Sequence, residues 1–555
     1  MFSLVKSALP RTAVAAALTS LVVACAPGTA ARPDATRAEV SNASTAGGSA
    51  GTATPPSGLD LDRVTIVDLQ NAMDDGTITS EQLTAAYLQR IERLNPLIGA
   101  VVRTNPDAMS IARASDDLRR GDGTRGPLEG IPVLLKENMD TADRQPTTAG
   151  SNALLDARPD DDAFLVTRLR EAGAVILGKA NMSEWANFRS PGAIAGWSAT
   201  GGQTRNPYVL GRSPCGSSSG SAAAAAAGLA AVTIGTDTDG SIVCPASVTA
   251  TVGVKPTLGL VSRNGIVPIT SRHDSPGPIA RSTTDAALTL AAIHGTDPAD
   301  PDSVDADDVL PADYRTMLDP NGLRGKRIGV WREGRIGVDP DVDRVFEQAV
   351  QQLEDLGATV VEGTEVPNSD EVVAEHLLPA VMTEFKHDLN AYLAATPGGH
   401  PNDLTGLIDY NRQHADTELA GFGQELFEMA DQTDGDITDP VYRAHREAAT
   451  EGARRAIDNT LAKYRLDAIV TPSERPAPAL DYQGGGKPFA SSTRNSALAG
   501  YPIVTVPAGY ARGELPLGLS FIGTAASDAK LITYAFAFEQ ATQVRRPPNY
   551  RPTLP

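Results

Sequence analysis

Short apolar runs alternate with amphipathic segments along most of the chain. Apolar residues recur at helical spacing from Thr79 to Leu94, and Thr79 with Gln82 has the spacing of a capping box. A second helix is expected from Pro106 to Arg120, and short buried strands are expected in GIPVLLKEN, AVILGKAN, AVTIG, DAIVTP and YPIVTVPAG. Helices that alternate with such strands predict an α/β fold with a covered sheet.

No clear linker divides the chain into two halves. The segment GTDPADPDSVDADDVLPADY is acidic and proline-rich, which is typical of a surface excursion, and RIGVWR restarts the alternation after it. A mostly helical stretch, about 325–465, follows. We therefore expect one large domain over residues 59–545 and a tail over residues 546–555.

The N-terminal segment has the features of an export signal. Lys6 and Arg11 precede an apolar stretch that is too short for a comfortable membrane span and ends in VVAC at Cys25. Small residues before a cysteine resemble a bacterial lipoprotein signal over residues 1–25, with Cys25 lipidated; an ordinary secretory peptide is the alternative. Residues 26–58 have the composition of a flexible tether. The expected location is the bacterial cell membrane, facing outside the cytoplasm, with the lipid on Cys25 as the membrane contact.

Composition narrows the possible partners. The 555 residues are 41% apolar and 21% charged, which permits a large core, and the net charge of −20 argues against nucleic acid as a partner. The three cysteines and scattered histidines do not have metal-ligand spacing, so no metal is expected, and the reaction inferred below requires no cofactor.

The stretch CGSSSGSAAAAAAG, from Cys215, admits several interpretations. It contains G-x-S-x-G with Ser218 at its centre, but the preceding residues make a poor strand, and His273 and Asp274 follow in the wrong order for a nucleophile elbow. A phosphate loop needs a lysine after the glycines. The alanines favour a helix from Ser221 to Leu229 over a flexible linker. We therefore expect a Gly/Ser loop that opens a closely packed helix.

Two further segments bring chemistry to this loop. AVTIG is followed by the polar turn TDTDGS, whose backbone amides can converge on one point and leave Ser241 at its end. Lys136 ends the apolar run IPVLLK, and burial would make its amine a base; a lysine that merely reaches solvent from a strand end is the alternative. A proton path from Ser241 through Ser217 to Lys136 needs no histidine.

At this point the sequence resembles the amidase signature family. The resemblance rests on GPLEGIPVLLKENMDTADRQPTTAGS, PCGSSSGSAAAAAAG, GTDTDGSIVCPAS and NSALAGYPIVTVPAGY, and it covers most of residues 60–545. It implies a central mixed β-sheet covered by helices, and a Ser-cisSer-Lys triad of Ser241, Ser217 and Lys136. The oxyanion amides would be those of Thr238, Asp239, Gly240 and Ser241.

The resemblance also implies a substrate class. Many members have two glycines before the nucleophile, whereas this chain has Asp239-Gly240, and TDGSIVCP with SPCGSSSGSA looks most like the peptide amidase branch. That branch implies hydrolysis of C-terminal peptide carboxamides, by a chain expected to be a monomer. A broad aliphatic or aryl amidase, or an esterase on the same triad, is the nearest alternative. The tRNA-transamidation subunit shares the family fold, but an exported enzyme would have neither tRNA nor ATP. A non-catalytic substrate-binding lipoprotein is the alternative from another class.

Four more residues near these motifs carry expectations. Trp185 and Asn187, in NMSEWANFRSPG, are candidate substrate contacts because a similar segment lines the family's cleft, and a purely structural role is the alternative. Cys215 and Cys244 flank the two catalytic serines in sequence. Two buried thiols are the favoured interpretation, and a disulfide is the alternative in an exported protein.

Overall fold

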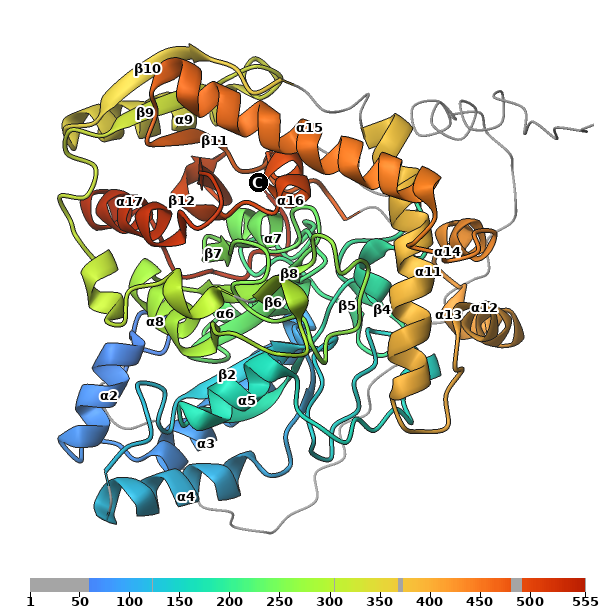
Figure 1. The fold of residues 1–555 in the computed structure, drawn as a ribbon. Helices are drawn as coiled ribbons and strands as arrows, with labels where there is room; N and C mark the ends of the chain where they lie inside the picture. Colours follow the sequence, from blue (N-terminus) through green and yellow to red (C-terminus); the bar gives the residue numbers. More distant parts are fainter. Residues whose placement is uncertain (1–58, 122, 304, 368–372, 481–491, 555) are drawn as a thin grey trace, which may run out of the picture. The chain divides into compact units, whose positions relative to one another are not determined.

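An eleven-stranded mixed β-sheet runs through the described part of the chain in this computed structural model (Figure 1). The structure describes residues 59–121, 123–303, 305–367, 373–480 and 492–554. The predicted signal, tether and lipidation site at Cys25 lie outside these residues. Among the helices described, none is both long and apolar enough to cross a bilayer.

The sheet contains both parallel and antiparallel neighbours, in the order β1-β3-β2-β6-β8-β7-β12-β13-β11-β9-β10. β2 lies parallel to β3 and β6, and β9 lies parallel to β10 and β11, while β8, β7, β12 and β13 form antiparallel pairs between these two groups. The strands are β1 (Val101–Thr104), β2 (Pro132–Lys136), β3 (Val175–Ala180), β6 (Val232–Asp237), β7 (Val252–Lys255), β8 (Ser275–Ala280), β9 (Arg327–Trp331), β10 (Thr359–Thr364), β11 (Ala468–Pro472), β12 (Ile503–Ala511) and β13 (Leu515–Ile522). A separate two-stranded ribbon joins β4 (Trp197–Ser198) to β5 (Gly202–Gln203).

Helices cover the sheet, as the sequence predicts for an α/β domain. α3 and α4 pack at the β1–β3 end, α6 and α8 pack on β6 and β8, and α9 and α17 pack on β12. The helices are α2 (Ile66–Asp74), α3 (Ser80–Ile98), α4 (Ala108–Gly121), α5 (Phe164–Glu171), α6 (Ser219–Ala226), α7 (Val243–Val248), α8 (Thr283–Ile293), α9 (Pro340–Asp355), α11 (Leu378–Ala395), α12 (Leu404–Gln413), α13 (Ala415–Glu418), α14 (Glu425–Asp431), α15 (Pro440–Tyr464), α16 (Arg494–Ala499) and α17 (Asp528–Thr542).

Local sequence signals explain several of these elements. Thr79 caps α3 with the predicted capping box: its hydroxyl accepts from the Gln82 amide, and the Gln82 side chain accepts from the Thr79 amide. α6 is buried along its whole length, because its alanines allow close packing. A Cβ on Gly220, near its start, would lie only 2.3 Å from the Asn181 carbonyl oxygen, so this helix fits only with glycine there.

The middle of the chain differs in part from the sequence expectation. The stretch over residues 325–465 is mostly helical, but it also contributes β10. Most residues of β10 are exposed or half-buried, so this strand lacks the apolar run that marks a buried strand. Figure 1 shows α11, α12, α13 and α14 gathered together beside α15. α11, α12 and α14 contribute to a second apolar cluster that is distinct from the main core, and α15 contributes to a third.

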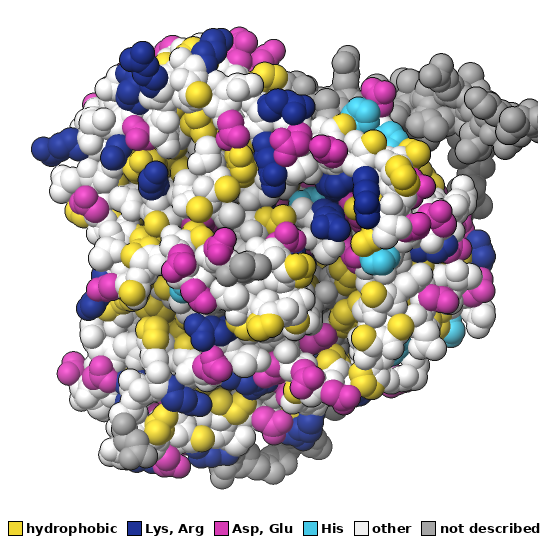
Figure 2. Space-filling view, viewed as in Figure 1, with side chains coloured by type: hydrophobic (Ala, Val, Ile, Leu, Met, Phe, Trp, Pro, Cys, Tyr) yellow, Lys and Arg dark blue, Asp and Glu magenta, His cyan; other side chains and the backbone are white. Residues whose placement is uncertain are grey.

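Figure 2 shows acidic and basic side chains interspersed over the face in view. The described residues of the predicted tail pair with the body of the domain, because the Tyr550 amide donates to the Pro207 carbonyl (3.0 Å) and the Leu210 amide donates to the Arg551 carbonyl (2.7 Å).

Candidate active site

The site forms where the neighbouring parallel strands β2 and β6 end. Leu135 of β2 pairs with Ile234 of β6, so Lys136 comes next to Gly235 and Thr236. Because parallel strands end at the same edge of a sheet, the residues that follow β6 lie beside the end of β2. The predicted polar turn and the predicted lysine are therefore brought together by strand register.

Lys136 is fully buried, and its amine has three polar neighbours. Nζ lies 2.8 Å from the Ser217 hydroxyl oxygen, 2.7 Å from Thr236 Oγ1 and 3.3 Å from the Thr236 carbonyl oxygen. Burial lowers the pKa of Lys136 from 10.5 to about 7, against the opposing effect of the Asp237 and Asp274 carboxylates. The amine can thus donate to both Thr236 oxygens while its lone pair accepts the Ser217 proton near neutral pH.

The serine loop contains the second predicted residue. The Gly216–Ser217 peptide bond is cis, and the Ser217 carbonyl accepts from the Ser183 amide (3.0 Å). The Ser218 hydroxyl makes two hydrogen bonds to the backbone of β6. It donates to the Thr236 carbonyl (3.0 Å) and accepts from the Thr236 amide (3.2 Å). Ser218 thus anchors the loop, as a structural residue would.

The elbow interpretation also lacks its partner residues. His273 is buried, with Nδ1 3.5 Å from Arg446, and burial holds its pKa well below the ordinary value. Asp274 accepts from the Thr238 hydroxyl (2.6 Å) and from the Ile269 amide (2.8 Å). Neither residue has a hydrogen bond to Ser218 among those the described residues make.

Ser241 lies on a turn that Asp237 organises. The Asp237 carboxylate, at the end of β6, accepts from the amides of Gly240 (2.7 Å), Ile242 (2.7 Å) and Val243 (3.3 Å). The Ser241 carbonyl in turn accepts from the Ser218 amide (3.1 Å), which joins the two serine loops. Ser241 is 8% exposed, whereas Ser217 is fully buried, so Ser241 is the serine nearer to solvent.

The three predicted oxyanion residues are held in different ways. The Gly240 amide already donates to Asp237, so it is not free to bind an oxyanion by itself. Asp239 is exposed, and its carboxylate accepts from Thr493 Oγ1 (2.7 Å) and from Arg494 Nε (3.1 Å). Thr238 is fixed through its hydroxyl to Asp274. The turn is therefore tied to residues far away in sequence.

Cys215 and Cys244 form a disulfide, with their Cα atoms 6.0 Å apart. The preference for two buried thiols is wrong. The two residues are 29 positions apart, but α6 and β6 return the chain so that the residue before Gly216 meets the first turn of α7. Both cysteines are only half-buried.

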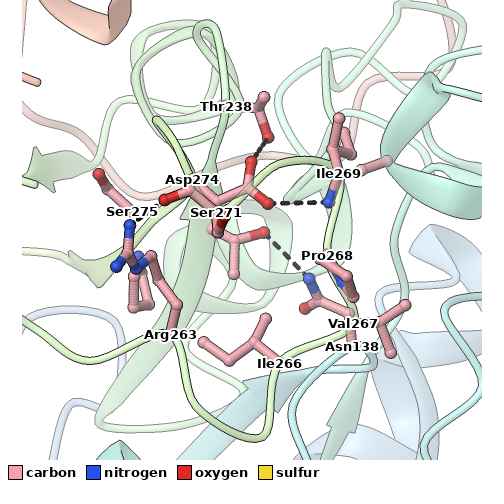
Figure 3. Close-up of a pocket in the computed structure, with 13 residues that line it drawn as sticks. Asn138, Thr238, Arg263, Ile266, Val267, Pro268, Ile269, Ser271, Asp274 and Ser275 are labelled. Atoms are coloured by element: carbon pink, nitrogen blue, oxygen red, sulfur yellow. Dashed lines mark hydrogen bonds between the residues drawn. The ribbon is translucent and has the colours of Figure 1, made fainter. Parts of the chain in front are cut away.

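A cavity of about 90 Å³ lies beside Thr236 and Thr238, and its lining residues do not include Lys136, Ser217 or Ser241 (Figure 3). Figure 3 shows the Thr238–Asp274 and Asp274–Ile269 hydrogen bonds at its wall, and Asn138 bonded through its side-chain amide to Thr236 Oγ1 (3.1 Å). Its further lining residues are Ala186, Arg263, Ile266, Val267, Pro268, Ser271, Ser275 and Pro276.

Two carboxylates of α11 hold one wall of this cavity. Glu384 accepts from the Thr270 hydroxyl (2.6 Å), and Asp388 accepts from the Ser271 amide (2.7 Å). Glu384 is itself held by Arg446 of α15 (2.6 Å, Nε to Oε1) and by the Tyr442 hydroxyl (2.7 Å). The helices of the middle segment therefore shape the wall of the cavity rather than the surroundings of Lys136, Ser217 and Ser241.

Comparison with known proteins shows the family of this chain. A family model described as Amidase matches residues 82–532. The chain belongs to the amidase family. The solved peptide amidase of Stenotrophomonas maltophilia is 48% identical, with a TM-score of 0.82, over 88% of this chain and 98% of that one.

Curated relatives of this amidase include enzymes with other names. A probable amidase of Arabidopsis thaliana is 41% identical over 88% of this chain and 92% of its own length. A glutamyl-tRNA(Gln) amidotransferase subunit of Moorella thermoacetica is 37% identical over 88% of this chain and 98% of its own length. The chain is thus an amide-hydrolysing enzyme with the fold of the amidase signature family.

The segment with Trp185 and Asn187 forms an unusual turn in the amidase. Trp185, Ala186 and Asn187 have φ angles of 47°, 53° and 69°, in the left-handed region that costs free energy for residues with a Cβ. The turn places Ala186 at the cavity. Trp185 is 3% exposed and packs edge-on against Phe427, with the ring centroids 5.5 Å apart. Asn187 is half-buried and is not among the lining residues of the cavity.

Several residues of the amidase site escape the sequence analysis. Thr236 accepts a hydrogen bond from the lysine, Asp237 shapes the turn that holds Ser241, and Thr493 with Arg494 fix Asp239. Asp237 carries a local signal, since an aspartate followed three residues later by glycine is typical of a side-chain-capped turn. Thr493 and Arg494 carry none, because their contact with Asp239 depends on the fold.

Proposed function

We propose that the amidase hydrolyses a carboxamide to a carboxylate and ammonia, with Ser241 as nucleophile, Ser217 as relay and Lys136 as base. The observation that carries this proposal is the 2.8 Å separation of Lys136 Nζ and Ser217 Oγ inside a fully buried site. A buried amine with a pKa of about 7 is half neutral at neutral pH, so it can accept a proton and return it.

Acylation proceeds through two linked proton transfers. Ser241 Oγ attacks the amide carbon and passes its proton to Ser217, whose own proton goes to Lys136. When the tetrahedral intermediate collapses, the same path returns the proton to the leaving nitrogen, and ammonia departs. Water then attacks the ester carbon of the acyl-enzyme, gives a proton to the relay, and releases the carboxylate with Ser241 restored. No step calls for a metal or a cofactor.

The oxyanion of the intermediate would bind backbone amides of the turn before Ser241. We assign this role to the amides of Thr238 and Asp239, with Gly240 as a shared donor because Asp237 already accepts its hydrogen. The contacts of Asp239 with Thr493 and Arg494 support the assignment, since they fix the turn before the substrate binds.

We propose C-terminal peptide amides as the substrate class. The 48% identity to a peptide amidase supports this class, and so does the Asp239-Gly240 pair in place of two glycines. A broad aliphatic or aryl amidase, or an esterase, would use the same three side chains. Ammonia release from an N-acyl-Gly-Tyr-amide, compared with a simple aliphatic amide at equal concentration, separates them. Preference for the simple amide would contradict the peptide-amide proposal.

The lipid anchor at Cys25 remains our proposal for the location of the enzyme. The Cys215–Cys244 disulfide supports export, because disulfides persist in oxidising compartments. Mass spectrometry of the membrane fraction should find a mature chain that starts at a lipidated Cys25. A mature chain that starts elsewhere and carries no lipid would contradict it.

Two serine variants test the triad. Ser241→Ala should reduce ammonia release by at least about 10⁴-fold while leaving substrate binding intact, because the covalent step is lost. Ser218→Ala is the matched control in the same loop, since the hydroxyl that it removes bonds to Thr236 of β6 and the backbone bond to Ser241 is kept. Its activity should stay within about tenfold of the wild type at 25 °C. Wild-type activity of Ser241→Ala would refute the triad, and loss of activity in Ser218→Ala alone would favour the elbow.

A further inference from the structure

The Cys215–Cys244 disulfide joins the two loops that carry the proposed relay and nucleophile. Cys215 precedes the Gly216–Ser217 peptide directly, and Cys244 lies three residues after Ser241. The Cys244 amide donates to the Gly240 carbonyl (2.8 Å), so the half-cystine is part of the nucleophile turn itself. The cross-link therefore lies two residues from Ser217 and three residues from Ser241.

Each loop is otherwise fixed separately to the end of β6. Ser218 ties the relay loop to Thr236, and Asp237 ties the nucleophile turn to its own strand. Between the loops, the Ser218 amide donates to the Ser241 carbonyl at 3.1 Å. One such hydrogen bond contributes about 1 kcal/mol net, so the disulfide adds a covalent constraint to this bond and to the packing of Ile242 against Ala222 and Ala225.

We propose that the Cys215–Cys244 disulfide is a positioning cross-link that aligns Ser217 with Ser241, so that amide hydrolysis depends on the oxidised pair. This inference rests on the proposed roles of the two serines. The cysteines take no part in the reaction; they act by limiting the distance between two loops that must pass a proton. A displacement of about 1 Å between reacting groups can lower a rate about 100-fold.

The same cross-link makes the enzyme sensitive to dithiols. Both cysteines are half-buried, so a small dithiol reaches the sulfur atoms from solvent. A thiolate of the dithiol attacks one cysteine sulfur, which releases the other cysteine as a thiolate and leaves a mixed disulfide. The second thiol of the dithiol then attacks the dithiol sulfur of this mixed disulfide and releases the remaining cysteine. The products are two protein thiols and one oxidised dithiol. Lys136 and Thr236 lie at the ends of β2 and β6, whereas Ser217 lies on the loop that follows Cys215, so reduction leaves Lys136 in place and can move Ser217.

The test measures steady-state kinetics of the full chain before and after reduction with dithiothreitol, at 25 °C. We expect kcat to fall about 10- to 100-fold with KM changed less than about twofold, and the acid limb of the pH profile to keep its midpoint near 7. Circular dichroism and iodoacetamide mass labelling show whether the reduced chain is folded and fully reduced. Re-oxidation should restore kcat.

The double variant Cys215→Ala/Cys244→Ala should match the reduced wild type, and dithiothreitol should not change its kinetics. If the folded, fully reduced enzyme keeps kcat within about twofold, the cross-link does not position the serines. If reduction only unfolds the chain, with no folded species of low kcat, the link stabilises the fold and the proposal is also wrong. Failure of the triad is seen separately, as ammonia release by Ser241→Ala in the oxidised enzyme.

Discussion

Replacing Lys136 with methionine should strongly reduce catalysis and at the same time stabilise the protein. Methionine has a similar volume and no charge, so it fills the fully buried position without the cost of burying an amine. Lowering the pKa of Lys136 from 10.5 to about 7 corresponds to about 5 kcal/mol against the charged form. This cost is the physical requirement for a lysine that acts as a base near neutral pH.

The pH dependence of the stability gain follows from the same numbers. Below pH 7 the folded protein must hold a charged amine, so the destabilisation is fully present. It decreases as the pH rises from 7 towards 10.5, because the folded amine is already neutral while the unfolded chain still loses its proton. The stability advantage of Lys136→Met should therefore narrow by about 3 kcal/mol between pH 6 and pH 9. Lost hydrogen bonds lower the advantage at both pH values alike.

Urea unfolding at the two pH values measures this difference, and kinetics measure the catalytic loss. We expect kcat/KM of Lys136→Met to fall at least about 10²- to 10⁴-fold, the usual contribution of a general base. Wild-type kcat/KM should fall about tenfold per pH unit below pH 7. Wild-type activity in the variant, or a stability gap that stays constant with pH, would refute the reasoning.

Lys255→Met is the matched control. Lys255 is also fully buried, burial lowers its pKa to about 8, and its amine donates to the carbonyls of Pro256 and Tyr501 (both 2.9 Å) rather than to a serine. The difference in the free energy of unfolding between Lys255→Met and the wild type should narrow by only about 1 to 2 kcal/mol between pH 6 and pH 9. The acid limb of the kcat/KM profile of Lys255→Met should keep the midpoint of the wild type.

Three further variants test the surroundings of the site. Trp185→Ala should cost about 3–5 kcal/mol of stability with little change in KM, because Trp185 packs in the core; a large rise in KM without loss of stability would restore it as a substrate contact. Asp239→Asn and Arg494→Gln should each lower kcat about tenfold, and the double variant should be no worse, since the pair acts as a unit; additive losses in kinetic assays would contradict this. Glu384→Gln should lower stability by about 3–5 kcal/mol and raise KM, because it leaves buried Arg446 without its counter-charge and loosens the cavity wall; an unchanged melting temperature would argue against it.

The parts of the molecule that the sequence predicts well depend on local patterns. The strands that end at Lys136 and at Asp237, and the alanine helix between them, are each predicted directly from a few neighbouring residues. Strand register then brings Lys136 next to Thr236, and the 2.8 Å approach to Ser217 follows.

Other features depend on residues far apart in sequence or on unusual backbone. β10 is too exposed to show an apolar run. The disulfide requires the chain reversal through α6 and β6, and the anchoring of Asp239 requires Arg494, 255 residues away. Trp185 faces the core because the left-handed turn redirects its side chain, and residue type alone does not encode that direction.

The residues that hold the cavity wall and the proposed reacting residues can change independently during evolution. Lys136, Ser217 and Ser241 belong to loops and strand ends within the first half of the chain, whereas Glu384 and Asp388, which hold the wall, belong to a helix in the second half. Mutations that accumulate in α11 and α15 can reshape the wall while the reacting atoms keep their places. A duplicated gene could in this way acquire a new range of amides without passing through an inactive ancestor. Random libraries confined to α11 and α15 should accordingly yield many active clones with altered substrate preference.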